Sequence, residues 1–173
     1  HSDYSQVSGH PDSSYWFGWM DYGDLSLPGA GQVGLHYDWP RIVLMGAMRT
    51  GEPAFFDLAT AMARHRVDID QFWSPRENEP FRGLQSRAGS TPTYHCSALY
   101  SPIGPDSHWM AGLVLYYMLT GEPKAMECIR DTSAGLKNSW AWIEKNKPYW
   151  SPARNVAANA QAIESYCAMY KLT

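Results

Sequence analysis

A segment that occurs twice constrains the fold of this chain more than any other feature. Residues 39–53 read WPRIVLMGAMRTGEP and residues 109–123 read WMAGLVLYYMLTGEP, so the matched glycines, Gly51 and Gly121, are 70 residues apart. Glycine favours the left-handed conformation just after a helix, and proline favours the first turn of the next helix. Each copy therefore predicts a helical hairpin, with an apolar inner helix, a tight turn and an outer helix.

The first copy predicts an inner helix from about Asp38 to Arg49, with Asp38 as its N-cap and Pro40 in its first turn. Residues 42–48 are apolar on all sides, which predicts a helix that is surrounded by protein. The outer helix, over residues 53–70, is amphipathic. Its inward side is expected to be Phe55, Leu58, Ala59 and Met62, and its outward side Asp57, Thr60, Arg64 and Asp68.

The second copy predicts an inner helix that begins at Asp106 or Ser107 and ends at Leu119. Its outer helix is expected over residues 123–137, followed by a short helix and an aromatic loop over residues 140–151. The inward residues of this outer helix are expected to be Ala125, Cys128, Ile129 and Leu136.

The end of the chain resembles a third copy. Residues 155–173 have a helical pattern and close with Tyr-Lys-Leu-Thr, which matches Tyr-Met-Leu-Thr at residues 117–120, with Thr173 lying 53 positions after Thr120. We therefore expect a third inner helix without its outer partner. The chain is then one domain over residues 1–173, incomplete, with its third hairpin truncated at Thr173 and with the rest of the array in a longer chain or in a second subunit.

The spacing of the copies distinguishes between architectures. Hairpins with a buried inner helix stack into solenoids or close into rings. Common solenoid repeats have periods of about 34 to 47 residues, whereas the offsets here are 70 and 53. The predicted fold class is therefore all-α, a partial α/α toroid of stacked helical hairpins with long loops at one rim.

Composition narrows the class of protein. A chain of 173 residues with 45% hydrophobic residues fits one globular domain, and a net charge of −3 gives no footprint for nucleic acid. No apolar run reaches the 18 or so residues that span a bilayer. The cysteines form no Cys-x-x-Cys pair, and we expect Cys128 and Cys167 to be buried free thiols. The aromatic content of 14% suits a sugar-binding cleft, with loop packing as the alternative for any single ring.

Several segments resemble a known family. They are residues 19–24 (WMDYGD), 36–39 (HYDW), 49–51 (RTG), 63–70 (ARHRVDID), and 107–109 (SHW) leading to 116–121 (YYMLTG). Together they resemble the toroid domain of exo-rhamnogalacturonan-lyase-like proteins and, more broadly, polysaccharide lyases with an α/α toroid. The resemblance implies cleavage of a pectin-like glycan that contains uronic acid, and a periplasmic or secreted location.

Polar residues gather in the segments before the two inner helices. Because equivalent parts of a repeat lie side by side, these two sets are expected to converge at one rim. The first set is Asp21, Tyr22, Asp24, His36, Tyr37 and Asp38, and the second is Tyr94, His95, Tyr100, Asp106 and His108.

β-Elimination from a uronic acid needs a neutralised carboxylate, a base for the C5 proton and an acid for the leaving oxygen. Histidine and tyrosine can serve as base and acid, and a cation can neutralise the carboxylate. The residues expected to be catalytic are Tyr94, His95 and His108, with His36 and Tyr37 facing them. Those expected to bind substrate are Trp19, Asp21, Tyr22, Asp24, Trp39, Tyr100 and Trp109.

Three alternatives stay open. A glycoside hydrolase would use paired carboxylates, Asp21 and Asp24 with Asp38 or Asp106, although helix capping explains the last two more simply. A divalent metal could bind His36, Asp38, His95 and His108, but no compact ligand motif is present, so we expect no cofactor. The third alternative is a non-catalytic domain that binds sugar or another helical repeat. The expected partner is an oligo- or polysaccharide, with no nucleic acid and no membrane.

Overall fold

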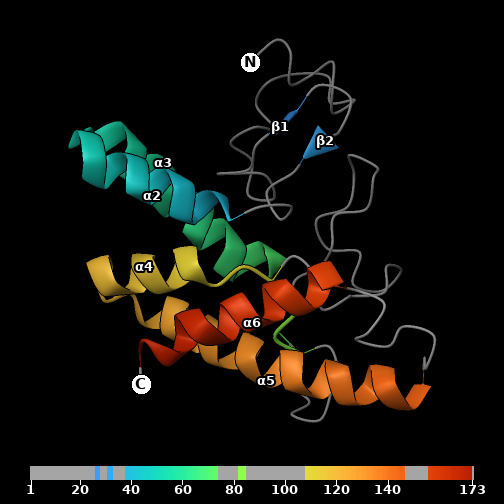
Figure 1. The fold of residues 1–173 in the computed structure, drawn as a ribbon. Helices are drawn as coiled ribbons and strands as arrows, with labels where there is room; N and C mark the ends of the chain where they lie inside the picture. Colours follow the sequence, from blue (N-terminus) through green and yellow to red (C-terminus); the bar gives the residue numbers. More distant parts are fainter. Residues whose placement is uncertain are drawn as a thin grey trace.

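The computed structural model describes residues 26–27, 31–32, 38–73, 82–84, 108–146 and 156–172, most of which are helical (Figure 1). The helices are α2 (Trp39–Thr50), α3 (Pro53–His65), α4 (Ala111–Thr120), α5 (Pro123–Asn146) and α6 (Val156–Tyr170). A π-helical segment, η2 (Arg66–Asp70), continues α3. The strands β1 (Ser26–Leu27) and β2 (Gly31–Gln32) form a short antiparallel pair. Apart from this pair and the short connecting segments, the described residues are helical, as expected.

Both predicted turns are present and have the same geometry. Gly51 and Gly121 each have a φ of +70°, the left-handed conformation. Their amide groups donate to carbonyl oxygens of the preceding helix, Gly51 to Ala47 at 2.8 Å and Gly121 to Tyr117 at 2.7 Å. A proline opens each outer helix. The two hairpins α2–α3 and α4–α5 therefore share one turn, as the repeated sequence predicts.

The threonine before each glycine fastens the turn on both sides. The Thr50 hydroxyl donates to the Gly46 carbonyl at 2.8 Å and accepts from the Glu52 amide at 3.2 Å. Thr120 makes the same two bonds in the second hairpin, at 2.7 Å and 3.2 Å. The hydroxyl thus links the last turn of the inner helix to the residue that begins the outer helix, which explains why Thr-Gly-Glu-Pro recurs as a unit.

One hydrogen bond links α4 to the residue before α2, and another links α6 to a residue just before α4. The Gly112 amide at the start of α4 donates to the side chain of Asp38 at 2.9 Å, just before α2. In α6 the equivalent residue is Ser165, whose hydroxyl donates to the carbonyl of His108, and His108 is the equivalent of Asp38. Equivalent positions of α4 and α6 thus each contact the residue that precedes an earlier helix, through a backbone amide in α4 and through a side-chain hydroxyl in α6.

Helix α4 lies at the centre, between the α2–α3 hairpin and the pair α5 and α6 (Figure 1). It is predominantly apolar, and its Leu113 and Val114 belong to the main core. The inward residues predicted for α5 are all buried, namely Ala125, Cys128, Ile129 and Leu136. This part of the prediction is confirmed, because the apolar stripe of an amphipathic helix marks its packed side.

The prediction that the first inner helix is surrounded by protein is wrong. In α2 only Leu44 and Ala47 are buried, whereas the side chains of Ile42 and Met48 are 53% and 54% exposed. The hydropathy of a sequence shows that a helix is apolar, but it does not show how many other helices pack around it. Among the described residues, α2 packs chiefly on α3 and α4, which leaves its other sides open.

The inward side predicted for α3 is half right. Ala59 and Met62 are buried, but Phe55 and Leu58 are 42% and 40% exposed. The buried side of α3 is shifted along the helix toward its C-terminal end, because that end rather than the start meets the second hairpin. The helical conformation reaches Asp70 as expected, although its last turn is η2.

Two element boundaries and the burial of one cysteine differ from expectation. Helix α4 begins at Ala111, after residues 108–110, which are not helical, whereas a start at residue 106 or 107 was expected. Helix α5 continues to Asn146, so the predicted break before Trp140 is wrong. Cys167 is exposed, and only Cys128 of the two predicted buried thiols is buried.

A buried polar cluster joins the end of the first hairpin to α5. The buried Arg66 guanidinium donates to Gln71 at 2.6 Å and to Thr132 at 3.3 Å. The buried side chains of His65 and Asp70 approach to 3.4 Å. The bond from Arg66 to Thr132 links the two hairpins. The other contacts satisfy buried charged groups of the first hairpin, since a buried charge is tolerated only with partners. Within the described segments, no helix combines the length and apolarity needed to cross a bilayer.

Candidate functional site

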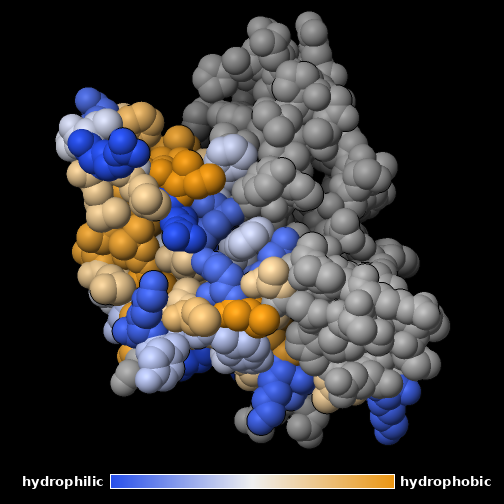
Figure 2. Space-filling model, in the orientation of Figure 1, coloured by the Kyte–Doolittle hydropathy of each residue, from blue (hydrophilic) through white to orange (hydrophobic). Residues whose placement is uncertain are grey.

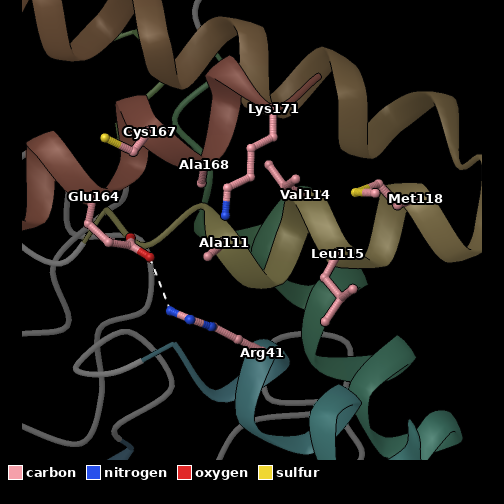
Figure 3. A pocket seen from close by; sticks show the side chains of 9 residues that line it. All are labelled: Arg41, Ala111, Val114, Leu115, Met118, Glu164, Cys167, Ala168 and Lys171. Atoms are coloured by element: carbon pink, nitrogen blue, oxygen red, sulfur yellow. Dashed lines mark hydrogen bonds and ion pairs between the residues drawn. The ribbon is translucent and has the colours of Figure 1, made fainter. Parts of the chain in front are cut away.

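A cleft of about 400 Å³ lies between α2, α4 and α6 (Figure 3). Apolar side chains of α4 form one wall, α6 forms the other, and the first turn of α2 closes one end. Nine residues line this cleft: Arg41, Ala111, Val114, Leu115, Met118, Glu164, Cys167, Ala168 and Lys171.

The lining of the cleft follows the repeat. Helix α4 contributes Ala111, Val114, Leu115 and Met118, and the residues 53 positions later, Glu164, Cys167, Ala168 and Lys171, are the contribution of α6. These positions have the spacing i, i+3, i+4 and i+7, which places them on one side of a helix. The equivalent of Ala111 in α2 is Arg41, which also lines the cleft. Inner helices therefore present one common side to this space.

Charged groups are concentrated on α2 and α6. The Arg41 guanidinium donates to a Glu164 carboxylate oxygen at 3.2 Å, and these side chains are 49% and 31% exposed. An ion pair this exposed contributes about 0–1 kcal/mol to stability. Lys171 extends from α6 into the space beside α4 (Figure 3). The cleft thus carries two cationic side chains against one carboxylate, an excess that favours an anionic ligand.

Asp38 supports the first turn that presents Arg41. Its carboxylate accepts hydrogen bonds from the amides of Arg41, at 3.3 Å, and Gly112, at 2.9 Å, so it caps α2 and holds α4. Burial raises the pKa of Asp38 from 3.8 to about 6, although these two amide hydrogen bonds act in the opposite direction. The capping role that the sequence predicts is confirmed.

Of the twelve residues predicted as catalytic or substrate-binding, the structure describes three. Trp39 and Trp109 are partly buried at equivalent positions beside the starts of α2 and α4. His108 has no exposed surface, so we assign it no direct contact with substrate. None of these three lines the cleft. The other nine lie outside the described residues: Trp19, Asp21, Tyr22, Asp24, His36, Tyr37, Tyr94, His95 and Tyr100.

Sequence reasoning missed the charged residues of the cleft. It concentrated on the segments that precede the inner helices, whereas Arg41, Glu164 and Lys171 lie within helices. The signal was present in the offsets, because residues 41, 111 and 164 are equivalent in the three inner helices. Arginine at this position in α2 and glutamate at it in α6 can form an ion pair because both helices reach the same cleft.

Among the described residues, no group of three or more His, Cys, Asp or Glu side chains is placed to hold a metal ion. Of the four ligands considered from the sequence, Asp38 uses its carboxylate on backbone amides and His108 is buried. The other two, His36 and His95, lie outside the described residues.

Comparison with protein-family models, with curated proteins and with solved structures finds no match to this chain.

Proposed function

We propose that this chain is a carbohydrate-active domain built as a partial α/α toroid, that it binds a polysaccharide containing uronic acid, and that it cleaves this polymer by β-elimination. The observation that carries the proposal is the cleft between α2, α4 and α6. Its walls are formed by four equivalent positions of α4 and α6. Its charged side chains are two cations, Arg41 and Lys171, and one carboxylate, Glu164. The resemblance to the toroid domain of exo-rhamnogalacturonan-lyase-like proteins supports the choice of reaction.

The cleft residues suit recognition of an acidic sugar. A uronate carboxylate can pair with Lys171, and with Arg41 once the pair between Arg41 and Glu164 rearranges. The apolar side chains of Val114 and Leu115 can pack against the C–H face of a pyranose ring. Each contact has a counterpart in the substrate: charge for the carboxylate and apolar surface for the ring.

The reaction also needs an acid and a base. In β-elimination a base removes the C5 proton, the electron pair forms the C4–C5 double bond, the C4–O bond breaks, and an acid protonates the leaving oxygen. A cation next to the carboxylate stabilises the negative charge that develops on it. The candidates for the proton transfers are Tyr94 with His95, and His36 with Tyr37, all of which stay predictions from the sequence.

Digestion of a uronic-acid polymer tests the proposal. Elimination creates a conjugated carboxylate that absorbs at about 235 nm, whereas hydrolysis creates reducing ends without this absorbance. We expect absorbance to rise with the wild-type chain and to rise much more slowly with His95→Ala and Lys171→Met. Lys137→Met removes an exposed lysine of α5 outside the cleft and is the matched control.

New reducing ends without the new absorbance would show that the chain cleaves the polymer by hydrolysis and not by elimination.

One observation favours the second candidate, a domain that binds sugar without cleaving it. His108, one of the predicted catalytic groups, is fully buried. Binding of the polymer with neither new reducing ends nor new absorbance would establish that candidate and contradict the lyase.

A further inference from the structure

The two oxygens of the Glu164 carboxylate have different surroundings. Oε1 accepts a hydrogen bond from the Arg41 guanidinium at 3.2 Å. Oε2 is buried, although the side chain as a whole is 31% exposed, and no donor from the described part of the chain lies within hydrogen-bond reach of it. Burying a carboxylate oxygen without a donor costs free energy. Oε2 therefore favours a ligand that brings a donor to it.

Glu164 belongs to the cleft between α2, α4 and α6. It lines this cleft from α6 and extends toward Arg41 of α2, and Lys171 lines the cleft two turns further along α6 (Figure 3). On the face drawn in Figure 2, hydrophilic residues gather between the α2–α3 hairpin and α6, while hydrophobic residues lie over the hairpin itself. A ligand in the cleft therefore meets two cations and one carboxylate together.

An acidic sugar offers one kind of donor to Glu164. Its carboxylate only accepts hydrogen bonds, so it pairs with Lys171 or Arg41, whereas its ring hydroxyl groups can donate. A hydrogen bond from a hydroxyl to an ionised carboxylate is shorter and stronger than one between neutral groups. A second carboxylate of the ligand at the same place would be repelled by the charge of Glu164. The surroundings of Oε2 therefore favour a hydroxyl group.

We propose that Glu164 is a specificity-determining residue of the cleft, which accepts a hydrogen bond from a free ring hydroxyl of the bound uronate. This inference rests on the proposed binding of a uronic-acid polymer and adds a second recognised group to it. Lys171 and Arg41 recognise the carboxylate, and Glu164 recognises the hydroxyl. Because an acylated hydroxyl has no proton to donate, the chain selects stretches of polymer whose hydroxyl groups are free.

Calorimetric titration of the full chain with trigalacturonate, and with analogues in which fluorine replaces the C2 or the C3 hydroxyl groups, tests the proposal. Fluorine removes the donor with little change in size. We expect at least one analogue to bind the wild type about tenfold more weakly than trigalacturonate. Glu164→Ala should reduce this hydroxyl preference to about twofold or less.

Two further variants support the comparison. Glu164→Gln keeps the size of the side chain and should also reduce the hydroxyl preference, because a neutral amide oxygen is a weaker acceptor than a carboxylate. Glu127→Ala removes an exposed glutamate of α5 outside the cleft and should leave the preference unchanged. Effects of fluorine on the ligand itself cancel, because all variants meet the same ligands.

The preference for trigalacturonate over its neutral methyl ester separates this proposal from the proposed function. Lys171→Met should lower the preference for the acid and leave the hydroxyl preference, whereas Glu164→Ala should do the reverse. Binding without a hydroxyl preference, or with one that both Glu164 variants retain, would overturn the role of Glu164 alone. A wild type that does not bind trigalacturonate would overturn the proposed function and this inference with it.

Discussion

At the scale of single residues, the contact between Gly112 and Asp38 decides how closely α4 approaches α2. A Cβ atom on Gly112 would lie closer than 3.0 Å to the Asp38 carboxylate and to the backbone nitrogen of Arg41, and backbone cannot move aside as a flexible side chain can. The absence of a side chain at residue 112 is therefore what allows a backbone amide to reach a carboxylate on the neighbouring helix.

We expect Gly112→Ala to lower the free energy of unfolding by about 1–3 kcal/mol, because it overpacks this contact. Gly46→Ala is the matched control, since its Cβ would meet only Phe55, at an ordinary 3.9 Å. That variant should gain up to about 1 kcal/mol from helix propensity. Urea unfolding of both variants measures the difference, and equal stabilities would contradict the described packing of α4 on α2.

Asp38 gives the fold a dependence on pH. Its pKa is 3.8 in an unfolded reference and about 6 in the folded chain, so the folded state binds the proton more tightly. The stabilising contribution of this proton is complete below the lower pKa and is lost as pH rises through about 6. The shift corresponds to about 3 kcal/mol at most.

Comparison of the wild type with Asp38→Asn isolates this effect from the other titrating groups. We expect the wild type to lose stability relative to the variant between about pH 4 and pH 7, by up to about 3 kcal/mol. Urea unfolding across this range measures it. A difference that stays flat, or a wild type that gains stability relative to the variant as pH rises, would show that burial does not raise the pKa of Asp38.

At the scale of elements, the hairpin turn is the unit that the sequence repeats. Gly51 and Gly121 share a φ of +70°, and a Cβ at either position would have nothing within 4 Å. Substitution therefore costs backbone strain alone. We expect Gly51→Ala and Gly121→Ala each to lose about 1–2 kcal/mol, because alanine disfavours this conformation.

Thermal or urea unfolding of the two glycine variants should give similar losses, and asparagine at either position should cost less than alanine. A large loss at one turn and none at the other would mean that the two turns are not equivalent, contrary to their matching hydrogen bonds.

The elements could be predicted because their signals are local. The Thr-Gly-Glu-Pro turns, the Asp38 cap, the buried stripe of α5 and the helix over residues 156–170 depend on residues a few positions apart. The exposed side of α2 could not be predicted, because it depends on which helices are adjacent. The continuation of α5 to Asn146 was missed because aromatic residues around position 140 resemble a loop while fitting a helix equally well.

The candidate site was harder to predict than the fold. Arg41 and Glu164 are 123 positions apart, and their pairing depends on α2 and α6 both reaching the cleft beside α4. Only the offsets between copies carried that information. The polar residues before each inner helix were selected for their chemistry, and of these the structure describes Asp38, a cap, and His108, which is buried.

At the scale of the whole molecule, α4 and α6 present equivalent positions to a cleft that Arg41 of α2 also lines, and the charged side chains of this cleft are two cations and one carboxylate. The central claim is that this cleft binds the carboxylates of a uronic-acid polymer. This claim can be tested independently of catalysis, because binding needs only the cleft. Cleavage also needs the acid and base that the sequence predicts in the segments before the helices α2 and α4.

The most direct measurement is a calorimetric titration of the chain with an oligouronate and with the same oligosaccharide as its neutral methyl ester. We expect the acid to bind about tenfold or more tightly than the ester, which corresponds to about 1.4 kcal/mol. Added salt and Lys171→Met should remove most of this preference, whereas Lys137→Met should leave it intact. Equal affinity for the acid and the ester, or a preference that survives Lys171→Met, would contradict the account.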